Sequence, residues 1–347
     1  MSEEGKELIP SRVICEERAL YQVQFGMESV KWAAISGKMK HQAAGRKDYP
    51  AVGDWVGIEI PSGADRAIIH TIGPRKSTIY RKQIGSSSDA QILSTNVDFT
   101  FITTSMNEDL SERRIERYLA MALESDTSPV ILLTKADLFP EGIDKVVEEL
   151  TTIFPGIPIY TLSKDAFDDA GFFATYLKLG TTSVIVGSSG VGKSTLVNFL
   201  TGKDRTDDQI ATKDIREKDG KGRHTTTSRN LYASRFGGLI IDTPGMRELS
   251  LSDHTQGVET QFSDIVELTT KCRFSDCKHE TEPKCAIKAA IADGSLPLDR
   301  WESYLKLEAE VQHGLIKQDK QLASEQKKQW KKITEAGRER GLAKKKS

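Results

Sequence analysis

Short runs in which apolar and polar residues alternate fill the first 85 positions of this 347-residue chain. Residues 19–25 (ALYQVQF) and 51–60 (AVGDWVGIEI) alternate with a period of two, which is typical of half-buried β-strands. Proline and glycine at 61–63 and 73–74 separate the runs as turns. Several short strands in so few residues predict a small closed barrel of the OB-fold or SH3-like type.

After residue 90 the pattern changes to short, continuous apolar runs with helical segments between them. Residues 111–124 place their apolar side chains at a 3.6-residue spacing, with Ser111 as the expected N-cap of a helix. The apolar runs predict buried strands at residues 97–102, 129–133, 157–160, 182–186 and 238–242. Buried strands alternating with helices predict an α/β domain.

A glycine-rich stretch follows the fourth of these strands and leads into a helical pattern. Its spacing fits G-x-x-x-x-G-K-[ST], the phosphate-binding loop, whose backbone N–H groups and helix N-terminus surround phosphate oxygens. We expect Lys193 to reach the β- and γ-phosphates and Ser194 to bind Mg²⁺. The strand and helix on either side argue against a chance match in a turn. The predicted phosphate-binding residues are Gly187, Ser188, Ser189, Gly190, Val191, Gly192, Lys193, Ser194 and Thr195.

The strand at 129–133 ends in Thr134-Lys135-Ala136-Asp137, which fits the guanine-reading signature [NT]-K-x-D. The Asp137 carboxylate can accept hydrogen bonds from guanine N1–H and the exocyclic amine, a donor pair that adenine lacks. The tetrapeptide alone would fit a surface turn, but the phosphate loop in the same chain favours guanine reading. The stretch 161–164 is expected to supply a weaker backbone contact to the base.

Two further motifs follow the phosphate loop. The polar residues 202–222 end in GRHTTT, where we expect Thr226 as a candidate Mg²⁺ ligand. The strand at 238–242 ends in DTPG, which places Asp242 by the Mg²⁺ shell and the Gly245 N–H by the γ-phosphate. Met246 stands where many GTPases have a water-orienting glutamine, so we hypothesise that His224 positions the attacking water. The alternative is that this histidine supports its loop or contacts RNA.

The order of these motifs is unusual. In common GTPases the phosphate loop comes first, whereas here Asp137 precedes Gly187 by 50 positions. The order therefore predicts a circularly permuted GTPase domain over residues 90–250, which keeps the site but moves the chain ends.

Three of the four cysteines cluster beside a histidine in the pattern C-x4-C-x-H-x5-C. Three thiolates and one imidazole can form a closed tetrahedral zinc site, and the alternative is free reduced cysteines in a helical region. We therefore predict one structural Zn²⁺ per chain, in a helical domain at residues 251–347. Its predicted ligands are Cys272, Cys277, His279 and Cys285.

The distribution of charge limits the classes of partner that we expect. Lys and Arg number 49 and Asp and Glu 50, so the chain is not a uniformly basic nucleic-acid binder. From Lys327 onward, however, nine residues are basic and two acidic, which indicates either a nucleic-acid contact or a solubilising tail. Basic pairs at 46–47, 75–76 and 81–82 leave the same choice for the barrel at residues 1–85, between RNA contact and a solvated surface.

The N-terminus is too polar for a signal peptide, and there is no apolar run of membrane-spanning length. We therefore expect a cytoplasmic protein with no membrane partner.

Taken together, a barrel, then TKAD, GSSGVGKST, GRHTTT and DTPG in that order, then C-x4-C-x-H-x5-C, resembles the ribosome small-subunit-dependent GTPases of the RsgA/YjeQ type. The resemblance covers nearly the whole chain. It implies an OB-fold barrel and a monomeric, Mg²⁺-dependent GTPase that cycles between GTP and GDP. It also implies stimulation by the 30S subunit late in its maturation, and 16S rRNA contacts from the OB and zinc domains. Thr134 replaces the more frequent asparagine, but its hydroxyl can still support the phosphate loop.

Two other functions fit parts of the pattern. An RNA-binding assembly scaffold could use the pocket only to sense GTP, and turnover measured with and without small subunits separates it from a GTPase. A P-loop ATPase would be revealed by competition between GTP and excess ATP, since Asp137 predicts little effect of ATP.

Overall fold

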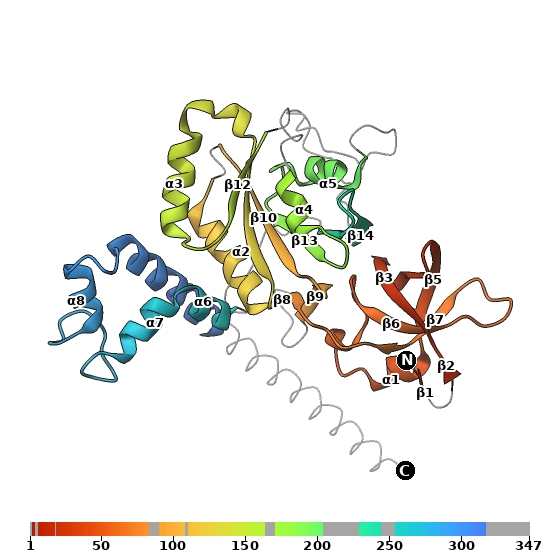
Figure 1. Cartoon of the computed structure of the whole chain (residues 1–347). Coiled ribbons are helices and arrows are strands. Elements are labelled where there is room, and N and C mark those ends of the chain that lie inside the picture. The colour runs from red at the N-terminus through yellow and green to blue at the C-terminus, as the bar shows by residue number, and fades with distance from the viewer. Residues whose placement is uncertain are drawn as a thin grey trace, which may run out of the picture.

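A computed structural model of the chain describes residues 2–3, 6–17, 19–82, 90–107, 110–163, 171–203, 229–243 and 254–316. Figure 1 shows a barrel in red and orange, a sheet with helices in yellow to green, and a helical unit in cyan and blue. No helix within these ranges combines the length and apolar character needed to cross a bilayer.

The N-terminal barrel closes on itself. Its strands run in the order β3-β4-β5-β7-β6, and β6 pairs back onto β3. With parallel pairing of β5 and β7, this is the five-stranded closed order of an OB-fold, so the predicted barrel is confirmed. Side chains such as Val13, Val23 and Ile58 fill its interior. The bounds are β3 (Ile9–Glu17), β4 (Leu20–Phe25), β5 (Ser29–Ile35), β6 (Trp55–Glu59) and β7 (Ala67–Ile72).

Smaller elements accompany the barrel. The short strands β1 (Ser2–Glu3) and β2 (Lys6–Glu7) pair antiparallel before it. Helix α1 (Gly37–Gln42) and the 3₁₀ turn η1 (Arg46–Asp48) lie between β5 and β6.

The strand expected at residues 51–60 begins only at Trp55, because the residues before it form a buried turn. The Asp54 carboxylate accepts a hydrogen bond from Ala51 N–H at 2.8 Å and forms a bidentate pair with Arg75 at 2.6 and 2.8 Å. Arg75 also donates to the backbone carbonyls of residues 47 and 49. Arg75, which was expected on a basic surface, therefore stabilises the loops of the barrel itself.

The strands β8 (Thr78–Lys82) and β9 (Ala90–Thr95) pair antiparallel and connect the barrel to the central sheet. In the described part of the chain that sheet runs β12-β11-β10-β13-β15-β14, parallel except for β14. β14 also pairs with β3, so the central sheet and the barrel share one continuous strand order. The bounds are β10 (Phe99–Ser105), β11 (Ser128–Thr134), β12 (Ile159–Leu162), β13 (Thr182–Gly187), β14 (Arg229–Ala233) and β15 (Leu239–Asp242).

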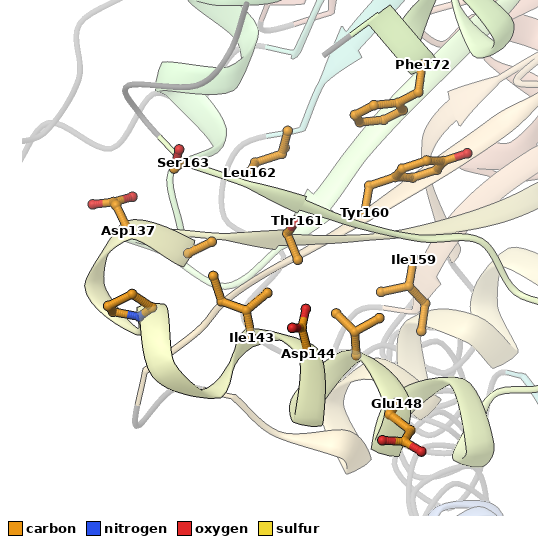
Figure 2. A pocket seen from close by; sticks show the side chains of 13 residues that line it. Asp137, Ile143, Asp144, Glu148, Ile159, Tyr160, Thr161, Leu162, Ser163 and Phe172 are labelled. Atoms are coloured by element: carbon orange, nitrogen blue, oxygen red, sulfur yellow. The ribbon is translucent and has the colours of Figure 1, made fainter. Parts of the chain in front are cut away.

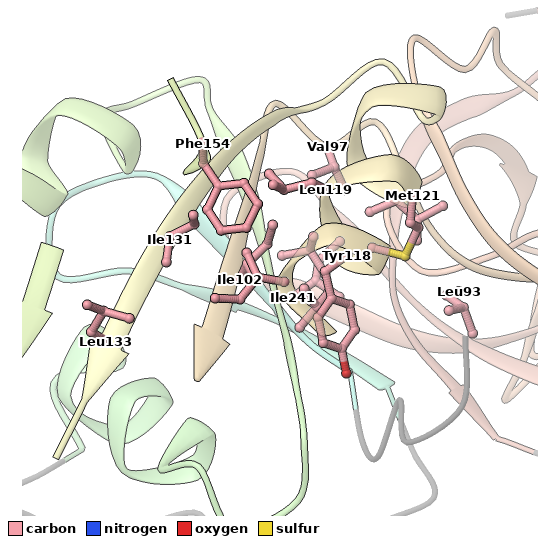
Figure 3. Close-up of a cluster of buried hydrophobic side chains, with 14 of the residues drawn as sticks. Leu93, Val97, Ile102, Tyr118, Leu119, Met121, Ile131, Leu133, Phe154 and Ile241 are labelled. Atoms are coloured by element: carbon pink, nitrogen blue, oxygen red, sulfur yellow. The ribbon is translucent and has the colours of Figure 1, made fainter. Parts of the chain in front are cut away.

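Helices pack on both faces of this sheet. On one face α2 (Glu112–Glu124) and α3 (Ile143–Ile153) cover a cluster of buried side chains that includes Ile102, Leu119 and Ile131 (Figure 3). On the other, α4 (Phe173–Tyr176) and α5 (Lys193–Thr201) cover a cluster rich in aromatic rings. Ser111 is the N-cap residue of α2, but its side chain makes no capping hydrogen bond; its backbone carbonyl accepts the first bonds of the helix, from the N–H groups of residues 114 and 115.

The C-terminal unit consists of α6 (Thr255–Gln261), α7 (Ser263–Thr270), α8 (Ala286–Ala292) and a helical segment at 298–316. It packs on α2 so closely that a Cβ at Gly257 would lie 1.9 Å from the Ala120 carbonyl oxygen. Glu124 accepts hydrogen bonds from Gly257 N–H at 3.1 Å and from the Tyr80 hydroxyl at 2.8 Å. α2 therefore joins the C-terminal unit to the β8–β9 hairpin. We retain 1–85, 90–250 and 251–347 as proposed domains, since residues 83–89 and 244–253 lie outside the described ranges.

Candidate nucleotide and metal sites

The predicted phosphate loop connects β13 with α5. β13 lies between β10 and β15, is buried along its whole length and ends at Gly187. Gly187 has φ +148°, and a Cβ there would lie 2.2 Å from the Thr103 carbonyl oxygen, so only glycine fits. Gly190 and Gly192 also have positive φ, and α5 begins directly after Gly192. The loop therefore presents the open N-terminus of α5 at the carboxyl edge of the sheet, a position suited to binding an anion.

Lys193 folds back across this loop. Its ammonium group donates to the carbonyl oxygen of Gly187 at 2.8 Å and to that of Ser188. A positive charge is thus held directly beside the backbone that would surround the phosphates. Ser194 and Thr195 follow it in the first turn of α5, and Ser188 and Ser189 precede it within the loop.

The end of β11 is tied to the phosphate loop. The Thr134 hydroxyl donates to the carbonyl oxygen of Val191 at 2.6 Å and lies 3.1 Å from that of Thr104. Lys135 then takes a left-handed backbone conformation with φ +58°, and η2 (Ala136–Leu138) begins after it. The structure therefore joins the predicted guanine-reading stretch to the predicted phosphate-binding loop.

Asp137 is exposed on η2 and lines one end of a cavity of about 730 Å³ between β12 and α3. In Figure 2 it lies beside Ser163, which belongs to the stretch expected to contact the base. Ala136 is buried beneath them. The carboxylate is therefore accessible to a planar ring entering this end of the cavity.

Asp242 ends β15, the strand next to β13. Burial raises the pKa of its carboxyl group above the usual value, and the positive charge of Lys193 acts in the opposite direction. The next residue, Thr243, is anchored by a hydroxyl hydrogen bond of 2.6 Å to the Ile185 carbonyl. A partly buried carboxylate beside the phosphate loop is the kind of oxygen ligand that Mg²⁺ takes. Three other predicted site residues, His224, Thr226 and Gly245, lie outside the described residues.

Four predicted metal ligands meet in the C-terminal unit. The donor atoms of Cys272, Cys277, His279 and Cys285 all lie within 4.8 Å of one another. The His279 Nδ1 atom lies 3.3 Å from Cys285 Sγ and 3.6 Å from Cys272 Sγ, and the two sulfurs are 3.9 Å apart. A tetrahedron with zinc–sulfur bonds of about 2.3 Å has edges of about 3.8 Å, so these residues could hold one metal ion. Cys15 lies apart, buried on β3.

Contacts around the cluster support this arrangement. Cys272 Sγ accepts a hydrogen bond from Ala286 N–H at 3.4 Å, and Cys285 is the residue directly before α8. The His279 ring meets Trp301 edge to face at 5.4 Å. The cluster therefore connects the loop at 272–285 to α8 and to the helical segment at 298–316.

Sequence patterns did not point to several residues of these sites. The backbone contact between Gly187 and Thr103 depends on the spacing of two strands far apart in sequence. Thr243 carries no signal beyond its place in DTPG. The walls of the large cavity, Asp144 and Glu148 of α3 and Tyr160 of β12, could have been suspected only if β12 had been recognised as the edge of the sheet.

Comparison with known proteins identifies the family. The RsgA GTPase family matches over residues 72–252. A "small ribosomal subunit biogenesis GTPase RsgA 1" from Oceanobacillus iheyensis is 43% identical over 332 residues, which cover 95% of this chain and 93% of that protein. The protein of the corresponding name from Opitutus terrae is 40% identical, covering 97% of this chain and 92% of its own.

Solved structures agree on the fold. YjeQ from Thermotoga maritima superposes with a TM-score of 0.64 at 25% identity, covering 87% of this chain and 98% of that one. YloQ, described as a circularly permuted GTPase, gives 0.62 at 24% identity, covering 90% and 98%. The circular permutation predicted from the motif order is therefore confirmed, and the chain belongs to the RsgA GTPase family.

Proposed function

We propose that this protein hydrolyses GTP during biogenesis of the small ribosomal subunit and that it does so on that subunit. Asp137 reads guanine, the loop at 187–195 binds the phosphates, and Ser194 and Asp242 hold Mg²⁺, with Thr226 as a further candidate ligand. The single observation that carries the nucleotide assignment is the hydrogen bond from Thr134 to the Val191 carbonyl. It ties the segment proposed to read the base to the loop proposed to bind the phosphates.

The chemistry proposed for the site is phosphoryl transfer to water. Bound Mg²⁺ would neutralise developing charge on the phosphate oxygens. The chain's own part is positioning: Lys193 and the α5 N-terminus place positive charge by the phosphates, and Asp137 fixes the base. Zn²⁺ at the Cys272 cluster would stabilise the fold of the C-terminal unit. This unit and the barrel would contact 16S rRNA.

GTP turnover measured with purified small subunits, with large subunits and with neither tests the proposal. We expect small subunits alone to raise the rate of GTP turnover at least about tenfold, as in GTPases whose catalytic site is completed by a partner. Lys193→Ala is the control and should show no stimulated turnover. Equal turnover in all three conditions would instead favour an RNA-binding scaffold that only senses GTP. Excess ATP should leave GTP binding unchanged, which excludes the ATPase alternative.

His224 stays a prediction of the sequence. We expect His224→Ala to slow single-turnover hydrolysis on small subunits about 100-fold, which is a typical rate enhancement from one proton-transfer group. GTP affinity should stay unchanged. Hydrolysis at the original rate would remove the assignment. The matched control is His313→Ala, in the C-terminal helical segment.

Thr134→Val tests the link between the two binding segments. Valine keeps the shape of the side chain but leaves the Val191 carbonyl without its donor, at a cost of about 1–3 kcal/mol. We expect GDP to dissociate about tenfold faster, measured with a fluorescent GDP analogue. Thr134→Ser retains the hydroxyl and should behave as the original protein. Equal rates for valine and serine would show that the hydrogen bond does not hold the loop.

Asp242→Asn separates the role of the carboxylate in folding from its role in hydrolysis. Because burial raises the pKa of this group in the folded state, keeping it ionised costs stability above that pKa and nothing below the usual value of 3.8. We therefore expect the variant without nucleotide to melt at a higher temperature at pH 7, with the gain vanishing near pH 4. Mg²⁺-dependent hydrolysis should fall about 100-fold.

Melting curves from pH 4 to 8 provide the measurement, with the exposed Asp144→Asn as a matched control. A lower melting temperature for Asp242→Asn at pH 7 would contradict the burial argument.

A further inference from the structure

The strand β12 forms an open edge of the central sheet. Within the described ranges it pairs only with β11, on its inner side. Ile131 N–H donates to the Pro158 carbonyl at 2.9 Å, and in a parallel ladder alternate residues bond the same neighbour. Ile159 and Thr161 therefore direct their backbone N–H and C=O groups outward. Such a row of groups is a template for an added strand.

A groove runs along this edge between β12 and α3 (Figure 2). Helix α3 forms one wall of the groove. Ile143 and Val147 give this wall apolar side chains, and the exposed Asp144 and Glu148 lie on the same helix. Figure 2 shows the Asp144 carboxylate pointing from α3 toward β12. The α3 wall of the groove therefore combines apolar side chains with negative charge.

An aromatic pair lines the other side of the edge strand. The rings of Tyr160 and Phe172 stack with centroids 3.8 Å apart and an angle of 4° between their planes. The Tyr160 hydroxyl lies 3.1 Å from that of Tyr176, which fixes the ring. A side chain of an added strand that pointed to this face would meet a flat, rigid apolar surface.

The nucleotide accounts for only one end of the groove. Asp137 and Ser163 lie at that end, whereas Glu148 lies at the other (Figure 2). Ile143 to Glu148 extends along α3 for about 7.5 Å at 1.5 Å per residue. The α3 part of the groove therefore lies beyond the side chain proposed to read the base.

The charge of the groove selects the class of partner. Its described lining contains the carboxylates of Asp137, Asp144 and Glu148 and no lysine or arginine. Such a surface repels nucleic-acid phosphates and attracts lysine and arginine side chains. The partner that fits is a polypeptide rather than RNA.

We infer that this groove binds an extended, basic segment of a small-subunit protein, which adds as a strand to β12. Alternate side chains of the segment are lysine or arginine facing α3, and the residues between them are apolar and face Tyr160 and Phe172. The source of the segment rests on the proposed function, whereas the groove and its preference for basic strands do not.

The first test measures binding of a labelled lysine–valine heptapeptide, KVKVKVK, to the full chain with GDP, by fluorescence anisotropy. We expect Asp144→Lys/Glu148→Lys to weaken binding at least about tenfold. Glu141→Lys/Glu149→Lys makes the same change in net charge outside the groove lining and should weaken it less than about twofold. Equal weakening by both double variants would overturn the inference. KVKPKVK lacks the N–H of residue 4, and KVKVKVK methylated on the backbone nitrogen of residue 5 lacks the neighbouring N–H, which points to the opposite side of the strand. Undiminished binding of both peptides would overturn strand addition.

The second test identifies the occupant on purified small subunits. Thr161→p-benzoylphenylalanine places a photocrosslinker in the groove, on the α3 side of the edge strand β12. We expect crosslinks to a lysine- or arginine-containing segment of a subunit protein. Crosslinks to rRNA, or to residues 317–347 of this chain, would overturn the assignment. If even the unsubstituted chain fails to bind small subunits, the proposed function and the source of the segment both fail, while the peptide measurement still decides the groove.

Discussion

Asp137→Asn is expected to lower GTP affinity about 100- to 1000-fold and to create affinity for xanthosine triphosphate. The aspartate carboxylate can accept from both guanine N1–H and the exocyclic amine. Asparagine offers one acceptor and one donor, so its amide N–H would face the guanine amine. One charge-assisted hydrogen bond of about 1.5–3 kcal/mol is lost, and the other becomes a neutral bond weaker by about 1 kcal/mol, which together account for the change.

Xanthine reverses the mismatch, because it carries a carbonyl oxygen where guanine has the amine. The asparagine amide can then donate to that oxygen while its own oxygen accepts from N1–H. The phosphate loop is untouched by the substitution, so we expect Lys193 and the α5 N-terminus to bind the triphosphate as before. Nucleotide selectivity should therefore switch with little loss of total affinity.

Titration of the two triphosphates by competition against a fluorescent nucleotide provides the measurement. Glu141→Gln removes a neighbouring exposed carboxylate on η3 (Pro140–Gly142) and should change neither affinity. If GTP and xanthosine triphosphate both lose affinity in parallel for Asp137→Asn, the variant has disturbed η2 rather than the base contact. An unchanged GTP affinity would show that Asp137 does not read the base.

The sequence was most informative where the functional residues lie in short, contiguous motifs. The phosphate loop and TKAD lie within a few residues each, and they occupy the predicted strand ends. The zinc motif is equally local, and its four donor atoms converge as its spacing suggests.

Features that depend on long-range pairing could not be predicted. The alternation at residues 51–60 indicates one strand, but its first half is a turn, in which the buried Asp54 carboxylate pairs with the partly buried Arg75. That pair joins residues 21 positions apart. Likewise, nothing local reveals that β14 pairs with β3 and joins the central sheet to the barrel. The open edge at β12 is also a property of sheet order.

Removal of the zinc ion proposed for the Cys272 cluster is expected to unfold the C-terminal unit and to leave the other two units folded. The buried cluster of that unit includes Cys285 itself, together with residues such as Phe262, Ile287 and Trp301. A structural zinc ion contributes an apparent 10–16 kcal/mol in small zinc-dependent folds, about as much as the entire stability of a domain. The barrel and the central sheet have their own buried clusters and should persist.

Metal analysis, tryptophan fluorescence and limited proteolysis together test this expectation. The untreated chain should contain one zinc ion. After chelation, the environment of Trp301 should change, because this ring packs against His279. Proteolytic cleavage should appear between residues 254 and 316, while GDP still binds at the phosphate loop.

Substitutions separate loss of the metal from damage by the chelator. Cys272→Ser should reproduce the chelated state, whereas His279→Cys offers a fourth thiolate and should retain both metal and fold. Cys15→Ala is the matched control, because that cysteine is buried on β3 away from the cluster. Since α6 packs on α2 through Gly257 and Ala120, the loss of the unit also removes a support of α2. A C-terminal unit that resists proteolysis without metal would show that its buried cluster and its contact with α2 hold the helices without zinc.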